Sequence, residues 1–139
     1  MIQGGIKQQI ELASKIESLT QIEVFIDDVC EHYKLGEDKY GNILIVLTEA
    51  VNNAITHGNK LDVDKMVSLN LEKSLDGLEF NVRDEGGGFD YDSIPDPTLP
   101  ENIEKIRGRG IFIMRALSDE IEFTDEGRAV KLKFSLSNN

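Results

Sequence analysis

The stretch "MVSLNLEKSLDGLEFNVRD", residues 66–84, has the pattern of two strands joined by a tight turn. Apolar residues occupy every second position on both sides of the turn: Val67, Leu69 and Leu71 before it, and Leu78, Phe80 and Val82 after it. Alternation with period two is typical of a strand with one buried and one solvated face. Asp76-Gly77 between the two runs is a strong hairpin signal. The sequence therefore predicts an antiparallel hairpin that buries one face.

The same alternation occurs near both ends of the chain. Residues 120–124, "EIEFT", and 130–136, "VKLKFSL", are joined by the turn "DEGR". Residues 6–12, "IKQQIEL", place apolar side chains on one side of a further strand. Clean alternation indicates an antiparallel sheet with one covered face.

Two segments with helical spacing can supply that cover. Residues 17–33 carry apolar residues at helical intervals, and residues 38–58 form a longer segment whose apolar face includes Ile43, Leu47 and Ala50. Gly58 is a helix stop signal. We therefore expect an α+β two-layer sandwich, and 139 residues suit one domain with one core.

Composition excludes several classes of protein. The formal charge is −11, which opposes binding to the phosphate backbone of a nucleic acid. No apolar run is long enough to span a membrane, and the N-terminus lacks the order of a secretory signal, so we expect a cytoplasmic protein without a membrane partner. The lone Cys30 lies among apolar residues and is interpreted as a buried small hydrophobe rather than a reactive thiol.

Three short motifs add polar residues that a core does not need. In "LTEAVNNAITHGN", residues 47–59, Glu49, Asn53 and His57 are four apart, so they share one helix face beside the apolar one. This row indicates groups at the edge of a cleft. A solvated helix rim is the plainer alternative.

The second motif, "RDEGGGFD" at residues 83–90, follows a predicted strand. The carboxylate of Asp84 can accept a hydrogen bond from an exocyclic amine such as that of adenine, and Gly86, Gly87 and Gly88 let the backbone approach a flat ring closely. An ordinary turn or a flexible hinge is the alternative.

The third motif, "KIRGRGIFIMRAL" at residues 105–117, places Gly108 and Gly110 just before a short apolar helix. Exposed N–H groups and the dipole at a helix start favour an anion, and Arg107 and Arg109 add cations there. A helix start with ordinary surface charges is the alternative. The proline- and glycine-rich stretch between the second and third motifs is typical of a functional loop.

Taken in order, these motifs resemble the N, G1 and G2 boxes of the GHKL ATPase superfamily, and most closely those of the small bacterial anti-sigma factor serine/threonine-protein kinases. The resemblance implies the Bergerat ATPase fold, in which helices cover one face of a mixed, mainly antiparallel sheet. It also implies a single domain over residues 1–139 with an ATP lid at about 88–109.

The resemblance implies ATP and Mg²⁺ as cofactors and gives roles to the motif residues. Asn53 would bind Mg²⁺ through its side-chain oxygen, which suffices because Mg²⁺ keeps waters and takes phosphate oxygens. Glu49 would be the general base. Asp84 would recognise adenine, with Gly86 and Gly88 shaping the pocket.

The same resemblance assigns the lid and the pocket edge. Gly108 and Gly110 would let the lid fold over the phosphates, with Arg107 or Arg109 near them. His57 would lie at the pocket edge.

The implied function is that of a kinase that phosphorylates a STAS-type anti-anti-sigma partner and binds a sigma factor. Small anti-sigma kinases are often dimers, so a homodimer is also implied. One departure stands out, because family members often carry a Gly-Thr pair where this chain has Gly127-Arg128-Ala129. The lost hydroxyl leaves open a nucleotide-gated binding module without kinase activity. A purely structural domain with a glycine-rich loop is a third alternative.

Overall fold

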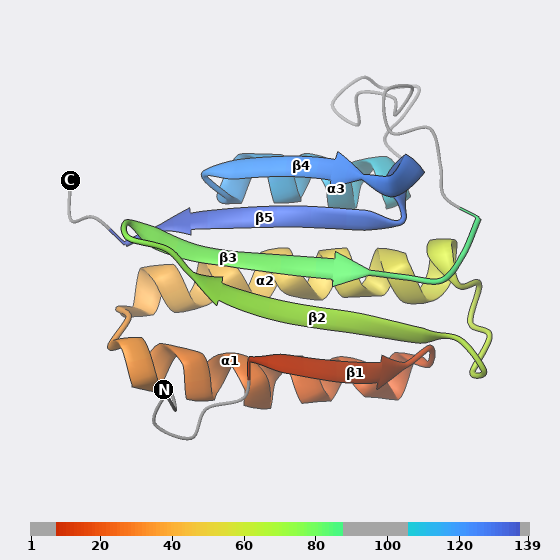
Figure 1. Cartoon of the computed structure of the whole chain (residues 1–139), viewed down its shortest axis with the longest axis horizontal. Helices are drawn as coiled ribbons and strands as arrows, with labels where there is room; N and C mark the ends of the chain where they lie inside the picture. Colours follow the sequence, from red (N-terminus) through yellow and green to blue (C-terminus); the bar gives the residue numbers. More distant parts are fainter. Residues whose placement is uncertain (1–7, 88–105, 137–139) are drawn as a thin grey trace.

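The computed structural model describes residues 8–87 and 106–136, which form two layers (Figure 1). One layer is a five-stranded sheet in the order β1-β2-β3-β5-β4. Its strands are β1 Gln9–Ala13, β2 Met66–Lys73, β3 Gly77–Arg83, β4 Glu120–Thr124 and β5 Ala129–Ser135. The other layer holds the helices α1 Thr20–Tyr33, α2 Glu37–Asn53 and α3 Ile106–Leu117, which all lie behind the sheet in Figure 1. The predicted α+β two-layer class is confirmed.

The sheet is antiparallel at each of its four described pairings, so the expectation of a mixed sheet is wrong. The reason lies in the position of β5. This strand pairs antiparallel with both β3 and β4, so β3 and β4 run in the same direction without being hydrogen-bonded neighbours. The crossover through α3 thus spans one strand of the sheet.

The predicted hairpin is present as β2 and β3, with a turn that differs from the expected one. The last register pair is Lys73 with Leu78, and the Ser74 N–H donates to the Gly77 carbonyl oxygen over 2.9 Å. Gly77 itself belongs to β3, where an added Cβ would overlap the backbone oxygen of Phe134 in β5. Close approach between strands therefore requires this glycine.

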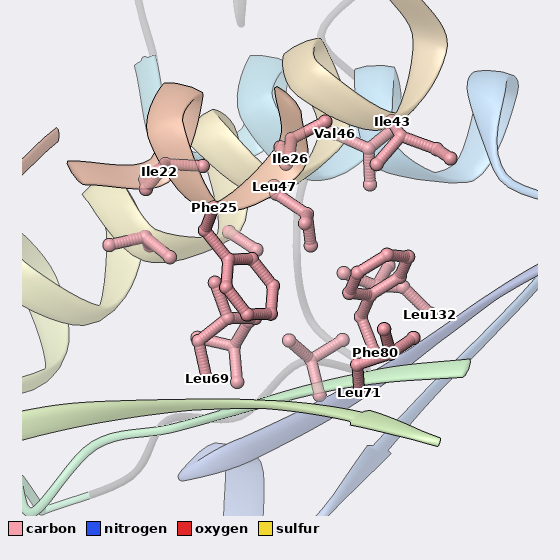
Figure 2. Packing of buried hydrophobic residues seen from close by; sticks show 14 of the residues in the cluster. Ile22, Phe25, Ile26, Ile43, Val46, Leu47, Leu69, Leu71, Phe80 and Leu132 are labelled. Carbon is pink, nitrogen blue, oxygen red and sulfur yellow. The ribbon is translucent and has the colours of Figure 1, made fainter. Parts of the chain in front are cut away.

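The core lies between the inner face of the sheet and the helices. Figure 2 shows Phe25 and Leu47 pointing from the helices toward Leu69 and Phe80 of the sheet. The rings of Phe80 and Phe134 meet edge to face with centroids 6.0 Å apart, a favoured aromatic geometry. The alternation in the sequence predicted this inner face correctly.

Two further expectations concern single features. Cys30 is buried in α1, as predicted, and burial together with the nearby Asp27 carboxylate raises its pKa to about 11. The thiol is therefore protonated at neutral pH and is a poor nucleophile. No helix in the described part of the chain has both the length and the apolar character needed to cross a bilayer.

The core position of Leu78 can be tested against Leu75, which is three residues away and fully exposed in the turn. Leu78→Ala removes a fully buried side chain and is expected to lower the free energy of unfolding by about 2–5 kcal/mol. Leu75→Ala is the matched control and should change it by no more than about 0.5 kcal/mol. Urea unfolding followed by circular dichroism measures both, and equal effects would contradict the described hairpin register.

Candidate functional site

A small cleft lies where α2 and α3 meet one end of the sheet. Its walls are largely apolar and come from α2, the π turn that follows it, α3 and the strands β3, β4 and β5: Ala50, Ala54, Val82, Met114, Phe123 and Val130. Three polar side chains also line it, namely those of Asn53, Asp84 and Arg128. Apolar walls with a few polar groups are typical of a small-molecule site.

Asp84 lines this cavity and directly follows β3. Its side chain is nearly buried, at 8% exposure. Its backbone N–H donates to the Arg128 carbonyl oxygen over 2.9 Å, and its carboxylate oxygen Oδ1 accepts from the Gly86 N–H over 2.7 Å. The carboxylate is therefore held in one orientation, because a charged acceptor strengthens such a bond.

The glycine turn after Asp84 packs directly against the end of α2. That helix continues into a π turn, Ala54–Gly58, which is closed by a hydrogen bond from the Asn59 N–H to the Ala54 carbonyl oxygen over 2.8 Å. A Cβ added to Gly86 would overlap the Gly58 carbonyl oxygen, and one added to Gly58 would overlap the Asp84 carboxylate. Both glycines are required for this contact, and π turns are frequent at functional sites.

Sequence reasoning identified Gly86 as a site residue but took Gly58 only as a helix stop. The signal for Gly58 was its place in the first motif, directly after His57. Its role was missed because a contact with Asp84 spans 26 positions and cannot be derived from helix periodicity.

Asn59 is a second residue that sequence reasoning missed. Its side chain is buried at 2% exposure and joins three segments. Nδ2 donates to Ser14 Oγ over 2.9 Å and to the Met66 carbonyl oxygen over 3.1 Å, while Oδ1 accepts from the Glu85 N–H over 2.8 Å. Asn59 thus fixes the residue next to Asp84 to the end of β1 and the start of β2.

Glu49 and Asn53 lie together on α2 and face α3. A Cβ added to Gly110 would be 2.7 Å from Glu49 Oε1 and 3.5 Å from Asn53 Nδ2. The structure thus brings the first and third motifs into contact. Within the described part of the chain, Asn53 Nδ2 is buried and has no hydrogen-bond partner. A buried amide of this kind normally has one, so the cavity offers a polar group that a ligand can satisfy.

The third motif begins differently from the sequence expectation. Helix α3 starts at Ile106 and includes Gly108 and Gly110, whereas the sequence predicted a helix start after both glycines. Glycine costs about 1 kcal/mol relative to alanine inside a helix. Here the lack of a side chain at Gly110 lets α3 approach Glu49, so packing outweighs propensity.

The remaining predicted residues are placed as follows. His57 is exposed in the π turn, and it is not among the described residues that line the cavity. Arg107 and Arg109 lie in the first turn of α3, but their side chains are outside the part of the chain that the structure describes. Gly88 and the expected lid over residues 88–105 also fall outside the described residues.

The turn before β5 forms the remaining wall. Asp125, Glu126 and Gly127 all have positive φ, at 53°, 58° and 89°. Arg83 Nη1 donates to Asp125 Oδ2 over 2.5 Å, and this bond is the main reason why the pKa of the Asp125 carboxyl is lowered. The carboxylate therefore stays ionised, and able to hold the turn, down to a lower pH than an ordinary aspartate.

The residues present fit a magnesium-bound adenine nucleotide. The apolar lining suits the faces of a flat base, Asp84 offers a carboxylate acceptor, and Asn53 beside Glu49 offers an Nδ2 donor without a described partner for a phosphate oxygen and an Oδ1 oxygen for a cation. The described residues hold no cluster of three carboxylate, histidine or cysteine side chains. A Mg²⁺ ion at Asn53 would therefore take its other ligands from phosphates and water.

The contact between Gly86 and Gly58 gives a stability prediction. Gly86→Ala adds a methyl group where a carbonyl oxygen lies and should lower the free energy of unfolding by about 1–3 kcal/mol. Gly87→Ala is the control, because a Cβ there meets no described atom within 4 Å. Chemical denaturation of both variants checks this, and a harmless Gly86→Ala would show that the two loops do not touch.

The hydrogen bonds of Asn59 give a second prediction about stability. Asn59→Ala leaves buried partners unsatisfied, including the Glu85 N–H, and should cost about 1–3 kcal/mol of stability. Asn81→Ala, on the outward face of β3, should cost no more than about 0.5 kcal/mol. Thermal and urea unfolding measure both variants, and a loss at Asn59 no larger than that at Asn81 would rule out the buried network.

Comparison with known proteins places the chain among relatives. Over 128 residues it is 33% identical to the anti-sigma F factor of Priestia megaterium, an alignment that covers 87% of this chain and 79% of the relative. It is 28% identical over 120 residues to the serine-protein kinase RsbW of Staphylococcus epidermidis, with 81% and 76% covered. It is 26% identical over 137 residues to the protein of the same name from Bacillus cereus strain B4264, with 94% and 85% covered.

A solved structure has the same fold. The histidine kinase domain from the blue-light activated histidine kinase of Erythrobacter litoralis EL346 superposes with a TM-score of 0.52 at 19% identity. The match covers 87% of this chain and 60% of that one. The model of the histidine kinase-like ATPase domain matches residues 12–134. The family implied by the three motifs is thereby confirmed, and the chain belongs to the histidine kinase-like ATPase domain family.

Proposed function

We propose that this protein is an ATP-dependent serine/threonine-protein kinase and anti-sigma factor that phosphorylates a STAS-type anti-anti-sigma partner. The single observation that carries the proposal is the shared cavity, in which Asp84 and Asn53 both line an apolar slot and Glu49 lies beside Asn53. Relatives named anti-sigma F factor and serine-protein kinase support it. A sigma factor as target makes the cytoplasm its place of action.

Adenine recognition is assigned to the end of the cavity that holds Asp84. The carboxylate would accept a hydrogen bond from the exocyclic amine of the base, since the Gly86 N–H already fixes its other side. Val82, Met114 and Phe123 would contact the faces of the ring. Gly86 and Gly88 would shape the approach to the base, and His57 would stay at the pocket edge.

Phosphoryl transfer is assigned to the end that holds Asn53 and Glu49. Asn53 would hold Mg²⁺, which when bound offsets the charge of the phosphates. Glu49 would accept the proton of the attacking serine hydroxyl as the bond to phosphorus forms and the bond to the leaving phosphate breaks. Gly110 leaves Glu49 the space to do so.

The third motif is assigned to the lid that would close over the phosphates. Gly108 and Gly110 would allow a close approach to the phosphates, and Arg107 or Arg109 would supply positive charge there. The N-terminus of α3 adds its dipole in the same sense, because helix N-termini favour anions.

Charge explains how the modified partner would leave. The chain carries a formal charge of −11, and a phosphate on the partner's serine adds about −1.5 to −2. Repulsion between the two would weaken docking of the product. Release of the phosphorylated partner would then free this protein to bind a sigma factor, so that the two partners would compete for it.

The role of Glu49 is testable by separating transfer from binding. Glu49→Ala should lower the rate of phosphate transfer to the STAS partner by about 10²–10⁴-fold, because a general base contributes that much. Its affinity for ADP should be little changed. Glu72→Ala removes an exposed carboxylate from β2 and is the control for net charge. Labelled ATP and calorimetry provide the two readouts.

The outcome also separates the alternatives. Transfer by Glu49→Ala at the wild-type rate would remove Glu49 from the mechanism. Wild-type protein that binds ADP but leaves the partner unlabelled would favour the nucleotide-gated binding module, which the missing hydroxyl at residues 127–129 motivates.

A further inference from the structure

None of the roles proposed above for cavity residues involves the side chain of Arg128. Arg128 follows the positive-φ turn of Asp125–Gly127 and lines the cavity together with Asp84. Its side chain is 28% exposed, so most of it is packed against neighbouring groups.

Two of its nitrogen atoms bind the glycine turn. Nε donates to the Gly86 carbonyl oxygen over 2.8 Å, and Nη2 lies 3.4 Å from that of Gly87. The Gly86 N–H in turn donates to Asp84 Oδ1 over 2.7 Å. Gly86 is therefore hydrogen-bonded through its carbonyl oxygen to the guanidinium group and through its N–H to the Asp84 carboxylate.

The third nitrogen holds the turn from which Arg128 extends. Nη1 is 3.0 Å from Glu126 Oε1 and 3.2 Å from the Asp125 carbonyl oxygen. Asp125 and Glu126 adopt left-handed backbone conformations, which cost energy for residues other than glycine and persist where the surroundings enforce them. The turn and the glycine loop are thus held by one side chain.

All three guanidinium nitrogens therefore already have partners, which argues against Arg128 as a phosphate ligand. Its contacts also lie at the Asp84 end of the cavity rather than beside Asn53. The planar fork of arginine suits two carbonyl oxygens at once, and a lysine ammonium cannot reproduce that geometry.

We propose that Arg128 is a positioning residue for base recognition, which acts through Gly86 to orient the Asp84 carboxylate toward an amino-substituted purine. The inference rests on the proposed nucleotide site. In this chain the arginine, which itself lines the cavity, fixes the recognition end of the pocket through the backbone of the glycine turn.

The test compares the affinities of ADP and IDP, which differ in carrying an amino or an oxo group at the same position of the base. Wild-type protein, Arg128→Ala, Arg128→Lys and the control Arg83→Ala are titrated by calorimetry. Arg83 binds the same Asp125 carboxylate but makes no described contact with the glycine turn. The control thus removes a cation from the turn while the link to Gly86 remains.

Arg128→Ala is expected to lower the affinity for ADP by about tenfold and to reduce the preference for ADP over IDP, because a misoriented Asp84 discriminates less well. Arg128→Lys should behave like Arg128→Ala, whereas Arg83→Ala should stay within about twofold of wild type. Thermal unfolding without nucleotide shows whether each variant is folded. A merely structural role would change this unfolding and leave the ratio of the two affinities unchanged.

Three results would overturn the inference. One is an unchanged preference for ADP in both Arg128 variants while wild-type protein binds ADP. Another is an equal loss in Arg83→Ala, which would assign the effect to the turn as a whole. Failure of wild-type protein to bind ADP would reject the nucleotide site itself, and the inference with it.

Discussion

The close contact between two backbones, at Gly58 and Gly86, is the constraint on which the rest of the site depends. Gly58 ends the π turn after α2, and Gly86 lies in the turn after β3. No side chain fits between them, since an added Cβ at Gly86 would overlap the Gly58 carbonyl oxygen. This contact joins the ends of a helix and a strand from different layers, and it is why Asn53 and Asp84 line one cavity.

The buried polar groups around that contact differ in whether they have hydrogen-bond partners. Asn59 and Asp84 are buried and hydrogen-bonded, Asp84 to the Gly86 backbone, and Asn59 to the Ser14 hydroxyl and to the backbone of neighbouring segments. Such bonds offset the cost of burial and fix the geometry. Asn53 Nδ2 is buried without a described partner, which costs stability. A protein that keeps such a group gains nothing in folding from it, so a role toward a ligand explains it better.

The periodicity of apolar residues along the chain predicted those parts of the fold that are determined by residues close together in the sequence. The alternation at Leu78 and Phe80 identified the inner face of β3, and helical spacing identified α1 and α2. The errors concern contacts between distant segments. Because β5 lies between β3 and β4 and runs antiparallel to both, the sheet is not mixed, and packing against Glu49 drew Gly110 into α3. The bond from Arg128 to Gly86 spans 42 positions and has no signature in the sequence.

The polar groups at the two ends of the cavity are held in different ways. In the proposed reaction, one end would therefore contribute to the affinity for the nucleotide and the other to the rate of transfer. At the Asp84 end, backbone bonds and the positive-φ turn fix the groups, so they would contact a base equally before and during reaction. Contacts of that kind strengthen binding without accelerating the chemical step. At the other end Glu49 and Asn53 are side chains on one helix, opposite a glycine of the next. In the proposed reaction, only groups at that end would change their interactions as a phosphate moves, so the acceleration would arise there.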